Sequence, residues 1–572
     1  MKYIIQYLKP HMRRMTLGLI IKFLGTITDL LLPYILAHII DDVVPTREIP
    51  MIVLWGICMI VCSVLCLLGN VIANRMASAV ARDAARDIRH DLFNRIMYLS
   101  CRQVDVCSIP SLESRLTSDT YNVHHMLGMM QRLGVRAPIL LIGGIMVTAY
   151  MEPVLTLVMV AVLPFITLVV WKISAKGIPL YTQTQTAVDN MIRVVRENVQ
   201  GVRVIKALSK TDYEKRRYED VNEALVQCET KAGVTMAATN PLMTIFLNTG
   251  LTAVIFVGAF RVNAGVSEPG KIMAFISYFT LISNAMMSVT RMFVQYSKGA
   301  ASANRIGEIL DLPVDMEQLA LETREGAPYL EFDDVSFSYK GMKDNLSHIS
   351  FTVPEGGTLG IIGATGSGKT TVTALLMRFY DADKGAIRIG GRDIRSMEDG
   401  ELREKFGIAM QNDFIYEGSV AENIRIGRDI PMEELRRAAE NAQALEFIDS
   451  RPDGFDYMLT TGGTNISGGQ KQRLLITRAL AGKPEILILD DASSALDYRT
   501  DANLRRALRE KCPETKATFI ITQRISAVMH CDRVLVLDEG GIIGAGTHEE
   551  LLDSCPIYRE IADSQLGGVI DE

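Results

Sequence analysis

Residues 363–371 have the types and spacing of a loop that binds nucleotide phosphates. The segment fits the pattern G-x-x-x-x-G-K-[ST] and consists of Gly363, Ala364, Thr365, Gly366, Ser367, Gly368, Lys369, Thr370 and Thr371. Because glycine has no Cβ, successive backbone N–H groups can turn toward a phosphate. Lys369 can reach the β- and γ-phosphates, and the hydroxyl of Thr370 can ligate Mg²⁺.

The residues around this loop supply the context that the pattern requires. The apolar run 359–362 before it predicts a buried strand, and the run 372–377 after it predicts a helix. A helix N-terminus adds its positive dipole end to a phosphate site. The alternative, a glycine-rich turn with an incidental lysine, is disfavoured because both neighbours are present.

Other polar residues follow strands of the same predicted sheet. Asp490 ends the strand 486–490, where it could hold the water shell of Mg²⁺, and Asp491 comes next. Gln411 and Gln523 follow the predicted strands 406–410 and 518–522. Since α/β sheets bind ligands at the carboxyl ends of their strands, we expect these side chains at the nucleotide. The expected metal ligands are Thr370, Gln411 and Asp490.

A second anion-binding helix end lies about a hundred residues downstream of the loop. Ser467, Gly468, Gly469 and Gln470 open a predicted helix through Lys471 and Arg473. Two such helix ends far apart in one chain suggest head-to-tail dimers whose subunits share nucleotides.

Composition indicates a membrane half and a soluble half. The chain of 572 residues is too long for one hydrophobic core. It is 48% hydrophobic, has a mean hydropathy of +0.17, and concentrates its apolar excess before residue 300. A net charge of -6 shows no basic bias toward nucleic acid. The nine cysteines lack paired or metal-binding spacing, which predicts free thiols.

The first 300 residues predict a six-helix transmembrane domain. Residues 1–14 suit a short amphipathic helix in the membrane interface. Six apolar segments follow, each near the ~20 residues that cross a bilayer. They lie at about 15–40, 51–73, 134–152, 154–173, 240–261 and 270–292.

Charge predicts the orientation of these spans. The connections after spans two and four are rich in Lys and Arg, whereas the loops at 41–50, 150–153 and 262–270 are not. The positive-inside rule therefore places both termini in the cytoplasm, and we expect the plasma membrane as the location. The two basic connections keep helical periodicity, so the helices should extend into the cytosol. Their tips, near 106–116 and 209–215, could touch a cytosolic domain.

Charged and methionine side chains within the membrane half remain open to interpretation. Lys22 and Asp29 could face a cavity or a partner; alternatively, they could satisfy each other, or Lys22 could extend toward the lipid headgroups. A methionine group could form an adaptable substrate surface, but ordinary packing is the more common role of such residues. The group consists of Met126, Met129, Met130, Met286, Met287 and Met292.

The remaining residues predict a soluble α/β domain. A polar segment at 301–328 is expected to link the transmembrane domain, 1–300, to this second domain, 329–572. Strand and helix patterns alternate in the second domain, as in nucleotide-binding folds.

The whole chain resembles a half-transporter of the ABC exporter family. Besides loop 363–371 (Walker A), the matching motifs are Tyr339, Gln411, 466–470 (signature), 486–490 (Walker B) and 494–497 (D-loop). In the membrane half, segments 114–119 and 197–207 resemble, more loosely, the family's segments that flank the coupling helices. The resemblance implies ATP and Mg²⁺ as cofactors, adenine stacked on Tyr339, and ATP held between the Walker A loop of one subunit and the signature of the other.

Three positions depart from the family pattern. Members that hydrolyse ATP well carry Glu where this chain has Asp491, and His where it has Gln523. Asp is one methylene shorter, and Gln cannot carry the charge of a histidine. Segment 460–464 also lacks the acidic residue usual in the family. We therefore expect Asp491, Gln523 and Gln411 to form a catalytic set with slow turnover.

These features predict one subunit of a heterodimeric exporter of an unidentified hydrophobic or amphipathic substrate in the lipid bilayer. Its signature would complete the active site of a second half-transporter; a homodimer is the less favoured assembly. An importer with the exporter fold and an ATP-gated regulator or channel are alternatives, because no motif encodes direction.

Overall fold

A computed structural model describes residues 2–339, 341, 344–411 and 413–566. The chain forms two compact units. Unit 1 comprises Met1–Met97 and Pro110–Leu312, and unit 2 comprises Tyr98–Ile109 and Pro313–Glu572. The segment Tyr98–Ile109 therefore belongs with the soluble unit, although it is bounded on both sides by membrane-unit sequence.

The described residues of unit 1 form helices joined by short turns, with no strand among them. Six of its helices are long and apolar enough to cross a membrane. A backbone in lipid must satisfy its own hydrogen bonds, so long apolar sequences fold as helices there. The helices are α1 (Lys2–Leu8), α2 (Met12–His38), α3 (Ile49–Met97), α6 (Thr120–Met151), α7 (Pro153–Gln200), α9 (Thr211–Ala237), α10 (Thr239–Asn263) and α11 (Pro269–Leu310).

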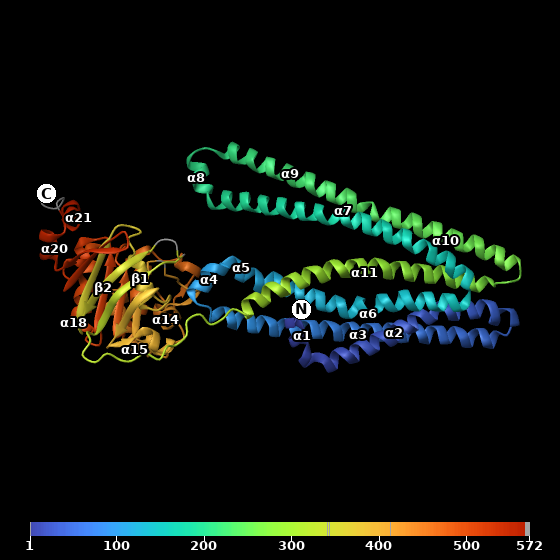
Figure 1. The fold of residues 1–572 in the computed structure, drawn as a ribbon, viewed down its shortest axis with the longest axis horizontal. Helices are drawn as coiled ribbons and strands as arrows, with labels where there is room; N and C mark the ends of the chain where they lie inside the picture. Colours follow the sequence, from blue (N-terminus) through green and yellow to red (C-terminus); the bar gives the residue numbers. More distant parts are fainter. Residues whose placement is uncertain (1, 340, 342–343, 412, 567–572) are drawn as a thin grey trace. The chain divides into compact units, whose positions relative to one another are not determined.

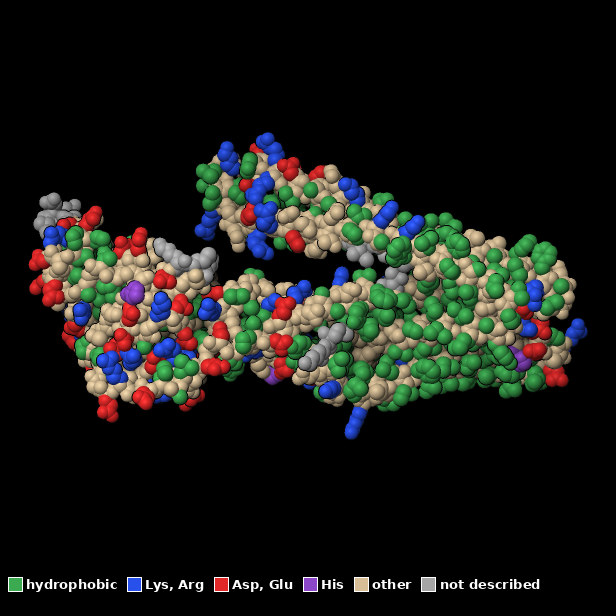
Figure 2. Space-filling view, viewed as in Figure 1, with side chains coloured by type: hydrophobic (Ala, Val, Ile, Leu, Met, Phe, Trp, Pro, Cys, Tyr) green, Lys and Arg blue, Asp and Glu red, His purple; other side chains and the backbone are tan. Residues whose placement is uncertain are grey.

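Several of these helices are far longer than a bilayer is thick. The 49 residues of α3 span about 74 Å, against about 30 Å of hydrocarbon core. Figure 2 shows apolar side chains covering the helices over one part of their length, while Lys and Arg gather around α8 (Val202–Ala207) and the adjoining parts of α7 and α9. The helix α9 runs back beside α7 (Figure 1). The helices thus continue beyond their apolar parts, as the sequence predicts.

Close packing and one buried carboxylate hold the bundle together. A Cβ on Gly69 of α3 would lie 3.3 Å from the Cα of Gly25 in α2, so these helices meet backbone to backbone. Asp119, at the start of α6, is 1% exposed and accepts a 2.8 Å hydrogen bond from Ser302 of α11. Its carboxylate is also paired with Arg305.

The tips of the two long connections lie earlier in the chain than predicted. The first tip forms α4 (Cys101–Cys107) and α5 (Ile109–Ser114), whereas we expected it at 106–116. The second forms α8, while the expected segment 209–215 is a turn and the first residues of α9. The hydroxyl of Ser100 caps α4 in a capping box with Gln103, which fixes the helix start at that point.

Unit 2 is built on two main sheets. The first has the order β2-β1-β4-β5, with β1 (Leu330–Phe337), β2 (Leu346–Val353), β4 (Lys384–Ile389) and β5 (Arg392–Asp393). The second has the order β12-β11-β3-β10-β9-β6, with β3 (Gly357–Gly363), β6 (Phe406–Ala409), β9 (Ile486–Asp490), β10 (Ala517–Thr522), β11 (Arg533–Asp538) and β12 (Gly541–Gly546). Its strands from β11 to β6 are parallel, so their carboxyl ends share one edge.

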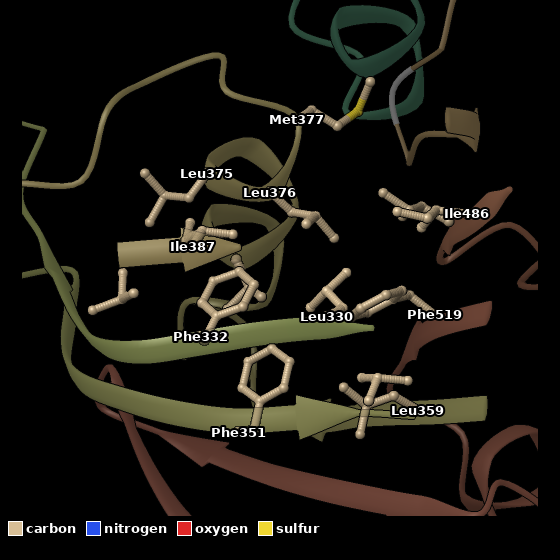
Figure 3. Close-up of a cluster of buried hydrophobic side chains, with 14 of the residues drawn as sticks. Leu330, Phe332, Phe351, Leu359, Leu375, Leu376, Met377, Ile387, Ile486 and Phe519 are labelled. Carbon is tan, nitrogen blue, oxygen red and sulfur yellow. The ribbon is translucent and has the colours of Figure 1, made fainter. Parts of the chain in front are cut away.

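One apolar core joins these sheets to the helix α12 (Lys369–Leu376). Figure 3 shows Phe332 of β1 facing Phe351 of β2, with Leu359 and Phe519 of the parallel sheet nearby. The rings of Phe332 and Phe351 stack with centroids 4.5 Å apart. This core fixes β3 and α12, and therefore the loop between them.

The segment between the units is partly helical. The expected linker 301–328 begins within α11, which ends at Leu310. The later part lies along the first sheet of unit 2, where Leu319 N donates to Arg395 O at 2.8 Å and Arg324 N donates to Gly391 O at 2.9 Å. The backbone of Arg324 and Leu319 is thus anchored to unit 2 rather than free.

Phe332→Ala should destabilise unit 2 strongly, because the removed ring is 1% exposed and leaves a cavity. Large-to-small changes of this kind cost about 3–5 kcal/mol. The thermal unfolding temperature of the purified protein should fall clearly. Ile543→Ala, at a side chain 43% exposed on β12, is the matched control and should leave it nearly unchanged. Equal effects of the two variants would contradict the assigned core.

Candidate nucleotide-binding site

A cavity of about 270 Å³ lies at the carboxyl ends of the parallel strands in unit 2. Ten of the residues predicted from the sequence line it, and they come from four separate segments of the chain. They are Thr365, Gly366, Gly368, Lys369, Thr370, Thr371, Gln411, Asp490, Asp491 and Gln523. The fold therefore brings the phosphate loop, the strand-end carboxylates and both glutamines to one place.

The phosphate loop depends on glycines at defined positions. A Cβ on Gly363 would lie 2.1 Å from the carbonyl oxygen of Leu537 in β11. Gly366 and Gly368 have φ values of 86° and 102°, which other residues rarely adopt. The helix α12 then begins at Lys369. Glycine is required at 363 because the backbone of β11 approaches closely there, and at 366 and 368 because the backbone is left-handed.

Lys369 and Ser367 fit a bound polyphosphate. The Lys369 ammonium donates to the carbonyl oxygens of Gly363 and Ala364 at 2.7 and 2.8 Å, which holds it over the loop. Burial lowers the pKa of Lys369, while Asp490 and Asp491 act in the opposite direction. The buried hydroxyl of Ser367 has no hydrogen-bond partner among the described residues. A cation and an unused polar group beside a helix N-terminus are what an anionic ligand requires.

The carboxylate of Asp490 fits a Mg²⁺ ion. Asp490 is 3% exposed, and this burial raises its pKa to about 6. A hydrogen bond from Thr370 and the charge of Lys369 lower the pKa, whereas the charge of Asp491 raises it further. A divalent cation would stabilise the charged carboxylate. Thr370, Gln411 and Asp490 would hold the ion, which neutralises phosphate charge when bound.

Tyr339 stands beside the loop within an aromatic group. Its ring packs edge-on against Phe337 and Tyr380, with centroids 4.9 and 5.1 Å away. Its hydroxyl lies 3.5 Å from the Thr371 hydroxyl. The position agrees with stacking on adenine, which stays a prediction.

The same aromatic group reaches α4. The hydroxyl of Tyr380 donates to Asp105 at 2.6 Å, and this partial burial beside a carboxylate raises the Tyr380 pKa. Gln103 donates to the carbonyl of Pro313 at 2.7 Å. Residues 100–105, at the tip of the first long connection, are therefore packed within unit 2, just before the segment that the sequence indicated.

Asp491 and Gln523 flank the loop from β9 and β10. Asp491 has a φ of 51°, and its N–H donates to Ile521 O at 2.7 Å. Burial raises the pKa of Asp491, while Arg524 and Lys369 oppose the rise. The amide of Gln523 donates to the Thr365 hydroxyl at 3.3 Å. Both side chains thus line the cavity together with the phosphate loop, and their catalytic role stays a prediction.

The signature residues form a separate helix end, outside this cavity. Ser467 caps α17 (Gly468–Leu480): its hydroxyl accepts from Gln470 N at 3.3 Å, and the Gln470 side chain accepts from Ser467 N at 3.0 Å. Gln472, which the sequence analysis missed, donates to the Ser494 hydroxyl and accepts from Ala495 N, both at 2.8 Å. Gln472 therefore ties the signature helix to the D-loop.

Two further residues were not predicted. Asn345 lines the cavity and accepts from Tyr339 N at 3.1 Å. No spacing rule identifies it, because it precedes β2 and reaches the loop only through the fold. Glu417 accepts a 3.3 Å hydrogen bond from Thr461, so a carboxylate from another segment stands beside the stretch 460–464, which has none of its own.

In the membrane unit, Lys22 and Asp29 do not satisfy each other. Lys22 donates to Asn70 and Asn74 of α3 at 2.7 and 3.0 Å, and Asp29 pairs with Arg136 of α6 at 2.7 Å. Of the alternatives from the sequence, the mutual pair is therefore wrong, and each residue faces a partner on another helix. Each charge instead cross-links α2 to another helix, which stabilises the polar groups inside the bundle.

Met126, from the methionine group, is a packing residue. It is 1% exposed, and a Cβ on Gly299 of α11 would lie 2.5 Å from its side chain. Met130 by contrast is 36% exposed. Because Met126 is buried and Met130 is exposed, the six methionines do not all lie on one common surface.

Six membrane-spanning helices followed by an α/β unit with a phosphate loop define an ATP-dependent membrane transporter. The family described as ABC transporter transmembrane region matches residues 15–286, and the family described as ABC transporter matches 346–494. The chain belongs to the ABC transporter family. It is a multi-pass half-transporter whose ATP-binding domain implies a transport-coupled ATPase.

Relatives cover nearly the whole chain. An uncharacterized ABC transporter ATP-binding protein of Mycobacterium tuberculosis is 32% identical over 99% of both chains, and YfiB of Bacillus subtilis likewise. The ATP-dependent lipid A-core flippase of Desulfotalea psychrophila is 36% identical over 70% of this chain and 71% of its own. A bacterial Atm1-family ABC exporter with ATP bound has the same fold, with a TM-score of 0.81, 23% identity, and coverage of 97% and 98%.

Lys369→Ala should sharply weaken ATP binding by this chain, because it removes a cation from the phosphate loop. Loss of one charge-assisted contact costs about 1.5–3 kcal/mol, or roughly 10- to 150-fold in affinity. Photolabelling with an ATP analogue measures the change. Lys384→Ala, at an exposed position on β4, is the control and should label like wild type. Unchanged labelling of the Lys369 variant would contradict the site.

Proposed function

We propose that the chain is one subunit of a heterodimeric ABC exporter in the plasma membrane. Its own nucleotide site binds ATP and turns it over slowly, and its signature completes the active site of the partner subunit. The substrate is a hydrophobic or amphipathic molecule, and both termini lie in the cytoplasm.

The observation that carries this proposal is the coincidence of Asp491 and Gln523 at one phosphate loop. Asp491 is one methylene shorter than the Glu of active members, so its carboxylate lies roughly 1 Å or more from the position that polarises the attacking water. Misplacement by about 1 Å can reduce the rate about 10²-fold. Gln523 can donate a hydrogen bond but has no ionisable proton. Both changes act on hydrolysis, whereas the loop that binds ATP is intact.

The heterodimer follows from what the chain retains. Its signature helix keeps Ser467, Gly468, Gly469 and Gln470, and the capping box shapes the helix N-terminus. In head-to-tail assembly this signature acts on the other subunit's ATP. A partner with Glu and His at the two catalytic positions would supply one fast site, whereas a homodimer would have two slow ones.

The substrate class and direction are supported by the relatives. Proteins of Desulfotalea psychrophila and Vibrio cholerae that resemble this chain are named ATP-dependent lipid A-core flippases, which indicates amphipathic substrates for such chains. The fold shared with an Atm1-family exporter favours export over import. The Lys and Arg side chains around α8 favour a cytoplasmic location for that end, by the positive-inside rule.

The signature should matter more to the native complex than the chain's own catalytic carboxylate. Ser467→Ala should reduce ATP turnover of the purified heterodimer strongly, because Ser467 serves the fast site. Asp491→Asn should change it little, because Asp491 serves the slow one. Steady-state ATPase assays of the two variants measure this difference in turnover. If Asp491→Asn abolished ATP turnover while Ser467→Ala kept the wild-type rate, the heterodimer proposal would be refuted.

The slow site should be repairable at two side chains. In the chain assembled without a partner, Asp491→Glu should raise ATP turnover, up to about 10²-fold, by returning the carboxylate to reach of the water. Adding Gln523→His should raise it further, with non-additive effects because both groups act on one transition state. ATP binding, checked by photolabelling, should be equal in all variants. Wild type turning over as fast as the double variant would refute the slow site.

A further inference from the structure

The helix α21 (Pro556–Leu566) reaches back from the end of the chain to the strand end that carries Gln523. One face of α21 packs into an apolar core, where Tyr558 is 0% and Ala562 is 2% exposed. Gln565 lies three residues after Ala562, so it belongs to the same face. Gln565 itself is at the surface of unit 2. It therefore continues the apolar contact of α21 with a polar one.

The side-chain amide of Gln565 binds the backbone on both sides of Arg524. Its oxygen accepts a hydrogen bond from Ile525 N at 2.9 Å, and its nitrogen donates to the Gln523 carbonyl at 2.8 Å. Only this orientation of the amide pairs a donor with an acceptor in both contacts. One side chain from α21 thus bridges the backbone across Gln523 and Arg524.

The start of the helix α19 (Ile525–Val528) shows what this bridge supplies. The N-cap residue Arg524 makes no capping hydrogen bond with its side chain, and Ile525 is 0% exposed. The first N–H groups of a helix have no partner within the helix, so a buried start needs an acceptor from elsewhere. Gln565 provides that acceptor in place of a capping side chain. It therefore fixes the point at which α19 begins.

The two residues inside the bridge both act at the nucleotide site. The side chain of Gln523 donates to the Thr365 hydroxyl of the phosphate loop at 3.3 Å. The guanidinium of Arg524 donates to the Ser494 carbonyl of the D-loop at 2.7 Å. A change in the backbone at Gln523 would therefore alter how its amide meets the phosphate loop.

Close packing does not hold Gln523 on the side that faces α21. A cavity of about 430 Å³ lies there, lined by Gly363 and Ala364 of the phosphate loop, by Ile561 of α21, and by Gln523 and Gln565. A side chain in a packed interior is fixed by its neighbours, but one that borders a cavity lacks contacts on that side. The position of Gln523 therefore depends on hydrogen bonds to its backbone, and Gln565 makes one of them.

We propose that Gln565 is a positioning residue for Gln523. The bridge holds the Gln523 amide where it contacts the γ-phosphate, which ATP has and ADP lacks. Gln565 does not touch the nucleotide, and it acts through the backbone of Gln523. The inference rests on the proposed role of Gln523 at the γ-phosphate. It makes α21 part of the device by which this site distinguishes a triphosphate from a diphosphate.

The test measures this preference in the purified full-length transporter. The chain is photolabelled on ice with an azido analogue of ATP and Mg²⁺, and AMP-PNP or ADP competes for the label. The two concentrations that halve the labelling give the preference for the triphosphate. Gln523→Ala should lower it about tenfold or more, because a hydrogen bond to a charged group is lost. Gln565→Leu should lower it about fivefold by weakening AMP-PNP binding alone.

The double variant shows whether the two residues act as a unit. Because Gln565 works only through Gln523, Gln565→Leu should add nothing to Gln523→Ala. Gln565→Glu keeps the size of the side chain and the acceptor for Ile525 N, but it lacks the donor to the Gln523 carbonyl. It should also lower the preference, and it decides the matter if the Leu variant does not fold. Asp563→Leu, at an exposed position on α21 outside the cavity, is the control and should match wild type.

Four results would overturn the inference. Gln565→Leu could weaken AMP-PNP and ADP equally, the losses could multiply in the double variant, or Asp563→Leu could lower the preference as much. In the fourth, both Gln565 variants keep the wild-type preference. If Gln523→Ala still lowers it, the positioning inference fails alone. If Gln523→Ala keeps it too, the proposed γ-phosphate role of Gln523 fails as well. The turnover assays above test the heterodimer separately.

Discussion

The backbone path from β3 into α12 is the constraint on which the nucleotide site depends. Gly363 lies so close to β11 that a Cβ would meet a carbonyl oxygen at 2.1 Å, and Gly368 turns the chain with a φ of 102°. Because β3 is held between β10 and β11, and β10 pairs with β9, the carboxyl ends of these strands stand at fixed places around the loop. Asp490 and Gln523 reach the loop only because this order is kept.

The parts that could be predicted are those encoded by local sequence. Apolar runs and the residues that bound them predict the strand ending in Asp490 and the helix after the phosphate loop. The structure has both elements. The six long helices follow from the length of apolar sequence that a bilayer requires. The tip helices were misplaced because a capping box at Ser100, rather than periodicity, sets where α4 begins.

Long-range partners could not be predicted. Lys22 meets Asn70 and Asn74 across two helices, and nothing in either helix indicates which residues face each other. Asn345 reaches the phosphate loop from the residues before β2, and Glu417 stands beside Thr461 from a different segment. Such contacts depend on packing and register, which sequence patterns of one element do not contain.

Hydrogen bonds through the D-loop connect the signature helix to the chain's own nucleotide site. This connection gives a reason for a slow site to keep binding ATP. Gln472 of α17 holds Ser494 and Ala495 of the D-loop, and Arg524 donates to the Ser494 carbonyl at 2.7 Å. Arg524 also acts on the charge of Asp491. In the proposed heterodimer, ATP at the slow site would hold this D-loop in place. The signature presented to the partner would then be ordered by a nucleotide that is seldom hydrolysed, and turnover at the fast site would set the transport cycle.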